Sequence, residues 1–86
     1  MMHNNPLRNN ITSVLCRTLT LEKIEPHIDL FDSGLLDSLS MVMLMVALED
    51  TFNVRIEPQD LDVEDFRSVI SITNLISRLS IVQLNP

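Results

Sequence analysis

The single glycine in this chain of 86 residues, Gly34, is the feature that most restricts how the sequence can fold. Tight β-hairpin turns and phosphate-binding loops both depend on glycines, so a β-rich fold is hard to build here. Apolar residues make up 45% of the chain but aromatic residues only 3%, so the core must consist mainly of Leu, Ile, Val and Met. Such side chains suit packing between helices, and the length suits one domain.

Charge and cysteine content narrow the possible partners. The formal net charge of −6 opposes binding to nucleic-acid phosphates and favours basic partners. The lone Cys16 cannot form an internal disulfide, and we interpret it as a small, partly buried residue. We find no secretion signal, and no apolar run approaches the roughly 20 residues that span a bilayer. We therefore expect a cytoplasmic monomer without a metal site or membrane insertion.

Apolar residues at helical spacing predict an all-α fold. The first helix covers residues 6–19, where Asn5 can cap the helix and Pro6 falls in its first turn. The second begins at Asp37–Ser38 and ends near Phe52. The last covers about residues 69–79, with Ser68 as its cap. The apolar faces of the first and last helices consist of Leu7, Ile11, Val14, Leu15 and Leu19, and of Val69, Ile72, Leu75, Ile76 and Leu79.

Three further segments complete the predicted domain. Residues 58–66 hold four acids and predict a short helix or turn with Pro58 near its start. Residues 80–86 should fray, so residues 1–86 form one domain with an ordered part over about 6–80. The connection over residues 20–37 is too apolar for a flexible linker, and we expect a long ordered loop across the bundle. His27 in this loop is interpreted as a surface residue.

The predicted second helix has two opposed apolar stripes. With Ser38 at zero and 100° per residue, the first apolar stripe falls between about 240° and 340°, and the second between about 40° and 140°. The first apolar stripe consists of Met41, Leu44, Met45, Leu48 and Phe52, and the second of Leu39, Val42, Met43 and Val46. Glu49 and Asp50 flank the second stripe at its far end.

A helix in so small a bundle should bury only one face. The second apolar stripe is therefore expected to be exposed beside Ser38, where with Glu49 and Asp50 it would form a partner-docking surface. The alternative is burial of this stripe by neighbouring loops, for example through Leu30 and Phe31.

The residues before and after Ser38 form a specific pattern. Asp37-Ser38-Leu39 opens the helix, after a leucine-bearing loop, residues 30–36, that contains an acid and Gly34. This segment resembles the attachment segment of the acyl carrier protein family, which includes the peptidyl and D-alanyl carriers. The resemblance covers about residues 29–79, and continues through Ala47-Leu48-Glu49 and Phe66-Arg67-Ser68-Val69.

The resemblance implies a four-helix bundle with a long first loop and a short third helix, and a carrier role rather than an enzymatic one. Ser38 would receive 4′-phosphopantetheine from coenzyme A through a separate phosphopantetheinyl transferase. Asp37 would help that enzyme hold magnesium, and Leu39 would contact it. The arm would then carry an acyl or aminoacyl group as a thioester from a loading ligase to a downstream transferase or synthase. A phosphate at the start of a helix also suits the positive end of the helix dipole.

The charge pattern of the second helix departs from that of carriers for fatty-acid synthesis. Ser40, Met43 and Thr51 stand where those carriers usually have acids, which weakens steering by basic partners. We therefore expect a dedicated carrier of the stand-alone aminoacyl, D-alanyl or peptidyl type. A general fatty-acid carrier is the alternative. Met41 and Met45 would border the gap where a cargo rests.

Two other classes of function compete with the carrier. A hydrolase with Ser38 as nucleophile needs a histidine, and only His3 and His27 are available. It would also lack a glycine-lined oxyanion hole. A helical interaction module would use Ser38 only as part of a helix start and would never carry a group.

Overall fold

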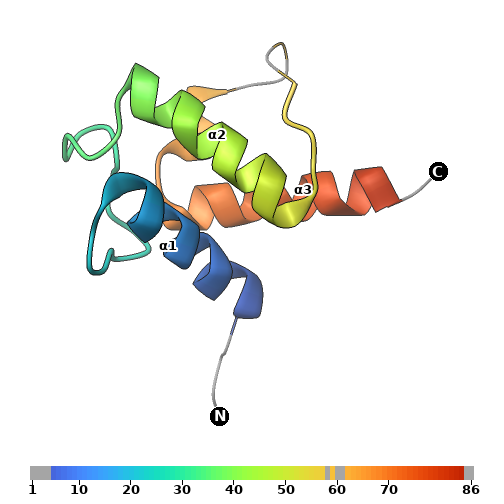
Figure 1. The fold of residues 1–86 in the computed structure, drawn as a ribbon, viewed down its shortest axis with the longest axis horizontal. Coiled ribbons are helices and arrows are strands. Elements are labelled where there is room, and N and C mark those ends of the chain that lie inside the picture. Colours follow the sequence, from blue (N-terminus) through green and yellow to red (C-terminus); the bar gives the residue numbers. More distant parts are fainter. Residues whose placement is uncertain (1–4, 58, 60–61, 85–86) are drawn as a thin grey trace.

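The computed structural model describes residues 5–57, 59 and 62–84, and this part of the chain is helical (Figure 1). The elements are α1 (Pro6–Leu19), α2 (Ser38–Phe52), the 3₁₀ turn η2 (Val63–Phe66) and α3 (Val69–Leu84). Helix α1 packs against both α2 and α3, and η2 packs against α3. The prediction of an all-α fold is therefore confirmed for the described residues.

The ends of α1 and α2 lie where the sequence places them. The Asn5 side chain accepts a hydrogen bond from the Arg8 N–H at 3.1 Å, and Pro6 occupies the first turn of α1. Thr20 follows α1 and Asn53 follows α2, both in the left-handed conformation that closes a helix. Capping residues can be predicted from the sequence, because only certain side chains can replace the hydrogen-bond partners that the first helical turn lacks.

The third predicted element is confirmed where the structure describes it. Residues 58–66 were expected to form a short helix or turn, and the structure has the 3₁₀ turn η2 over Val63–Phe66. Asp62 starts this turn by accepting the Glu64 N–H at 3.0 Å, and Ser68 already accepts the Ser71 N–H of α3 at 3.1 Å. Too few residues remain between the two caps for an α-helix. Pro58 and residues 60–61 lie outside the described residues.

The predicted end of α3 is wrong. Residues 80–84 were expected to fray, but α3 continues to Leu84. No glycine or proline interrupts this stretch before Pro86, so no stop signal ends the helix at residue 79. Residues 85–86 lie outside the described part.

The core forms between the three α-helices and the long loop, residues 20–37. Both Leu30 and Leu36 of the loop are buried, with 0% and 3% of their surface exposed. The long loop is therefore packed across the bundle, as predicted. The other buried apolar residues are Ile11, Val14, Leu15, Leu44, Leu48, Val54, Ile56, Phe66, Val69, Ile72, Leu75 and Ile76. Within the described part of the chain, we find no helix with the length and apolarity that a bilayer-spanning segment needs.

Candidate functional site

Ser38 is the first residue of α2, and its side chain is exposed. Among the described residues, no group forms a hydrogen bond with the Ser38 hydroxyl. The hydroxyl therefore stands at the positive end of a helix that is long enough to have a dipole, with room for a substituent. The structure confirms that the segment Asp37-Ser38-Leu39 opens this helix, as the sequence predicts.

Asp37 caps α2 together with Ser40. The Asp37 carboxylate accepts the Ser40 N–H at 2.9 Å and the Ser40 hydroxyl at 2.8 Å, while the Ser40 oxygen accepts the Asp37 N–H at 2.9 Å. The hydrogen bond from the Ser40 backbone, followed by that from its side chain, lowers the pKa of Asp37 from its ordinary value. Asp37 is thus both fixed in place and kept ionised.

The partnership of Asp37 with Ser40 was not predicted from the sequence, which indicated only that the helix begins at Asp37–Ser38. The signal is present, because an N-cap residue followed three positions later by a hydrogen-bonding side chain is the spacing of a capping box. Serine in place of the usual Glu or Gln at that position makes the pattern easy to overlook.

A compact turn brings the chain to Asp37. The Asp29 carboxylate accepts the N–H groups of Phe31 and Asp32 at 3.0 and 2.9 Å. Gly34 follows with a φ angle of 80°, in the left-handed region that favours glycine. The Leu36 N–H then donates a hydrogen bond to the Leu30 carbonyl at 2.9 Å, which closes the turn directly before Asp37.

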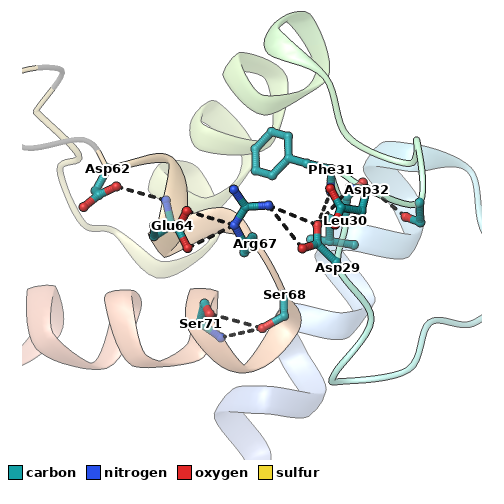
Figure 2. A network of polar contacts seen from close by, with 10 residues as sticks. Asp29, Leu30, Phe31, Asp32, Asp62, Glu64, Arg67, Ser68 and Ser71 are labelled. Carbon is teal, nitrogen blue, oxygen red and sulfur yellow. Dashed lines mark hydrogen bonds and ion pairs between the residues drawn. The ribbon is translucent and has the colours of Figure 1, made fainter.

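Arg67 joins this turn to the corner between η2 and α3 (Figure 2). Its guanidinium lies between Asp29 and Glu64, at 3.1 Å from Asp29 Oδ2 and 2.9 Å from Glu64 Oε2. The Arg67 carbonyl accepts the Leu30 N–H at 2.7 Å, and its guanidinium lies 5.7 Å from the Phe31 ring centre. The hydrogen bonds that Arg67 donates to Glu64 and then to Asp29 raise the pKa of Arg67. The sequence does not predict this contact, because no local pattern connects residues so far apart in the chain.

The second apolar stripe lies in solvent. Leu39 is 72% exposed, Val42 52%, Met43 51% and Val46 59%. Leu30, which was considered as a cover for this stripe, is instead fully buried in the core. The alternative of a covered stripe is therefore wrong, and the apolar surface begins at the residue that follows Ser38.

The two acids at the end of the stripe differ in their surroundings. Glu49 is half-buried, and its Oε2 accepts the Ile56 N–H at 2.7 Å, so this carboxylate fastens the segment after α2. Asp50 is exposed. Of the two acids, Asp50 is the more exposed to solvent.

The first apolar stripe faces the core. Leu44 and Leu48 are fully buried, while Met41, Met45 and Phe52 are partly buried and pack against the same cluster. Helix α2 therefore has one face in the core and one in solvent, and Ser38 lies at the end where the exposed face starts.

The residues considered for other chemistry do not join the site. His27 is exposed in the long loop and has no hydrogen bond to Ser38, and His3 lies outside the described residues. The described residues hold no group of three His, Cys, Asp or Glu side chains placed to bind a metal ion. Cys16 is half-buried, as predicted. A hydrolase mechanism at Ser38 thus has no histidine partner in the described part of the chain.

The fold, the exposed serine and its capping acid define a class of protein. The family model for the phosphopantetheine attachment site matches residues 7–76, and the chain belongs to this family. In this family, 4′-phosphopantetheine is attached covalently to a serine.

The similar curated proteins share one description. The chain is similar to the D-alanyl carrier proteins of Streptococcus pyogenes serotype M5 (strain Manfredo), serotype M49 (strain NZ131) and serotype M1. Each is 41% identical to it over 51 residues, which cover 59% of this chain and 65% of the relative. The chain thus matches somewhat less than two thirds of the length of these relatives.

Proposed function

We propose that Ser38 is the serine that receives the phosphopantetheine arm. The observation that carries this proposal is the free, exposed hydroxyl at the first residue of α2, inside the segment that matches the family model. A phosphodiester at this position would lie at the positive end of the helix dipole. The site therefore fits the group in both space and charge.

In the attachment reaction, the Ser38 oxygen would attack the phosphate of coenzyme A that bears the pantetheine. The bond between Ser38 Oγ and phosphorus forms, the diphosphate bond of coenzyme A breaks, and adenosine 3′,5′-bisphosphate leaves. The hydroxyl proton passes to a base of the phosphopantetheinyl transferase. Asp37, kept ionised by Ser40, would contribute to the magnesium site of that enzyme, and the 72% exposed Leu39 would contact it.

The second apolar stripe, with Glu49 and Asp50 at its end, is the proposed docking surface for partner enzymes. Each of its four side chains is more than half exposed and lies on the same helix as Ser38. A partner that covers this stripe would therefore have the arm within its reach. Methionine in such a stripe adapts to partners of different shape.

The proposed cargo is an amino acid. The outer face of α2 carries Ser40, Met43 and Thr51 where fatty-acid carriers usually have acids, and the similar curated proteins are D-alanyl carriers. D-Alanine is therefore the first cargo to test, with a dedicated ligase as the loading enzyme and a downstream transferase as acceptor. Met41 and Met45, both half-buried, would border the space in which the cargo rests.

Further properties belong to this proposal. Residues 1–86 would work as one monomeric carrier domain in the cytoplasm, where Cys16 stays reduced. The 3₁₀ turn η2 would take the place of the short third helix in the four-helix arrangement of the family.

Intact-mass measurement tests the attachment site. The purified protein, confirmed to be unmodified and folded, is incubated with coenzyme A, magnesium and a broad-specificity phosphopantetheinyl transferase. We expect one added phosphopantetheine, absent in Ser38→Ala and retained in Ser13→Ala, which removes an exposed serine of α1. An unmodified wild-type protein, or a modified Ser38→Ala variant, would overturn the proposal. An unmodified wild type would instead favour a plain interaction module with the exposed stripe as its surface.

Loading of the modified protein tests the cargo. A D-alanine-activating ligase with ATP should form a thioester that hydroxylamine cleaves, whereas an acyl ligase with a long-chain fatty acid should not. Loading by the fatty-acid enzyme alone would contradict the aminoacyl assignment and leave the attachment site standing.

A further inference from the structure

Arg67 is the residue of the η2–α3 corner that contacts the long loop with both its backbone and its side chain. The side chain donates to Asp29 at 3.1 Å, and the backbone carbonyl accepts the Leu30 N–H at 2.7 Å. Figure 2 shows the guanidinium between the loop and η2, beneath the Phe31 ring. These contacts fix two successive loop residues against a different part of the chain.

A short path of backbone hydrogen bonds leads from Arg67 to the start of α2. The Arg67 carbonyl holds the Leu30 N–H, and the Leu30 carbonyl holds the Leu36 N–H at 2.9 Å. Leu36 directly precedes Asp37, and its side chain is 3% exposed. The residues that follow, Asp37 to Leu39, are exposed, so Leu36 is the buried point nearest to Ser38 on the loop side.

The Asp29 carboxylate has two tasks that depend on its contact with Arg67. Its Oδ1 atom accepts the Phe31 and Asp32 N–H groups and so shapes the turn, while Arg67 donates to Oδ2 at 3.1 Å and, at the longer distance of 3.4 Å, to Oδ1. The side chains of Asp29 and Arg67 are only about one third exposed, 34% and 35%, so solvent replaces the contact incompletely. Without Arg67, the turn keeps its internal hydrogen bonds but loses the charged partner that places it on the η2–α3 corner.

We propose that Arg67 is a positioning residue for Ser38, which acts by holding the turn of residues 29–36 in the place that sets the first turn of α2. This inference rests on the proposed function, because it concerns the rate at which Ser38 accepts its group. Arg67 does not touch Ser38; it acts through Asp29, Leu30 and Leu36.

The test compares initial rates of phosphopantetheine attachment at limiting transferase, followed by intact mass. Arg67→Gln removes the charge and is expected to lower kcat/KM roughly tenfold, because small misplacements of a reacting group are costly. Arg78→Gln is the matched control, since Arg78 also pairs with an acid of η2, Asp65, at 3.3 Å and the substitution changes the net charge equally. It should react at the wild-type rate.

A second variant tests the same contact in case Arg67→Gln does not fold. Asp29→Asn keeps the Oδ1 acceptor for the turn but removes the charge that Arg67 contacts, so it should slow attachment while the protein stays folded. The double variant should be no slower than the slower single variant, because both changes remove the same contact. Additive effects would contradict action through this pair.

Amide hydrogen exchange separates positioning from general destabilisation. In Arg67→Gln the Leu30 and Leu36 amides should exchange faster, whereas the Ile72 amide, which donates to the Ser68 carbonyl at 3.0 Å inside α3, should be unchanged. Equal acceleration at Ile72, or an attachment rate equal to that of Arg78→Gln, would overturn the inference. A wild-type protein that accepts no group would instead overturn the proposed function.

Discussion

The Asp37 carboxylate accepts two hydrogen bonds from Ser40, one from the backbone at 2.9 Å and one from the hydroxyl at 2.8 Å. Both bonds favour the charged form of the acid, which lowers its pKa. An acid that remains ionised next to an attachment serine is suited to share a magnesium ion with a transferase. The same contacts therefore serve both the helix start and the proposed chemistry.

Removal of the Ser40 hydroxyl should raise the pKa of Asp37. In Ser40→Ala the backbone N–H remains, and it is the larger cause of the lowered value, so the pKa should rise but stay below the ordinary 3.8. NMR titration of the carboxyl carbon measures it. Ser33→Ala, in the preceding loop, is the control and should leave the Asp37 pKa unchanged. A Ser40→Ala value equal to that of the wild type would contradict this assignment.

The acids Asp29 and Asp37 should make stability depend on acidic pH. The pKa of each is lowered in the folded protein, chiefly by the backbone N–H of Asp32 and of Ser40 respectively. In the unfolded chain an aspartate titrates near about 3.9. Each acid therefore stabilises the fold above that value, and the contribution is lost as the pH falls through the lower folded pKa.

Urea unfolding as a function of pH measures this contribution. The midpoint of Asp29→Asn/Asp37→Asn should lie below that of the wild type at neutral pH, and the difference should shrink below about pH 4. A difference that grows on acidification would show that the sign of the effect is wrong. Asp50→Asn, an exposed acid of α2, is the control for the loss of one charge.

At the scale of single residues, the sequence predicted the helix caps but not the contact of Arg67, and Ser38 as the attachment serine stays a prediction. A cap acts within a few positions, so its residue type and spacing are visible in one stretch of sequence. The contact of Arg67 with Asp29 spans 38 positions and depends on how the loop lies over α3. Arg67 appeared only as part of a family pattern, which gave no reason for a charge at that position.

Helix α2 is an element whose two apolar faces have opposite environments. Leu44 has 0% of its surface exposed and Leu39 72%, although both are leucines of the same helix. Periodicity predicted that the two stripes are opposed, and the small size of the bundle predicted that one of them is exposed. Only the structure shows which face this is: α1 and α3 leave the face of α2 beside Ser38 uncovered.

Truncation of these two leucines should give very different stabilities. Leu44→Ala should lower the free energy of unfolding by about 2–5 kcal/mol, because it leaves a cavity in the core. Leu39→Ala should change it by less than about 0.5 kcal/mol, because its side chain is already in solvent. Urea unfolding at neutral pH measures both. Similar losses in the two variants would show that the second apolar stripe is covered in solution.

The wrong prediction for the end of α3 has a physical cause. Sequence signals mark helix starts better than helix ends, because capping side chains are specific whereas an end needs a glycine, a proline or a change of pattern. Helix α3 lacks such a signal until Pro86 and so reaches Leu84. The segment before α3 has a capping residue on each side, Asp62 and Ser68, and the 3₁₀ turn η2 between them agrees with the predicted short helix or turn.

For the whole molecule, the charge and the proposed docking surface lie in different places. The net charge is −6, yet of the two acids beside the second apolar stripe only Asp50 is exposed. Glu49 is half-buried and accepts the Ile56 N–H at 2.7 Å. Long-range attraction to a basic partner then acts on the molecule as a whole, while the contact between the partner and the second apolar stripe is apolar. Salt screens the long-range attraction and leaves the apolar contact largely intact.

The KM of the loading ligase for the carrier should therefore depend weakly on salt. Raising the ionic strength from about 0.01 M to 1 M shortens the screening length from roughly 30 Å to 3 Å. We expect KM to rise by less than about tenfold across this range, since steering changes the encounter rate more than the apolar contact.

Val46→Ser, at a side chain that is 59% exposed, should raise KM at every salt concentration without changing the free energy of unfolding. The contrary result would be a wild-type KM that rises about a hundredfold, with Val46→Ser equal to the wild type at high salt. It would show that the ligase recognises charges outside the second apolar stripe.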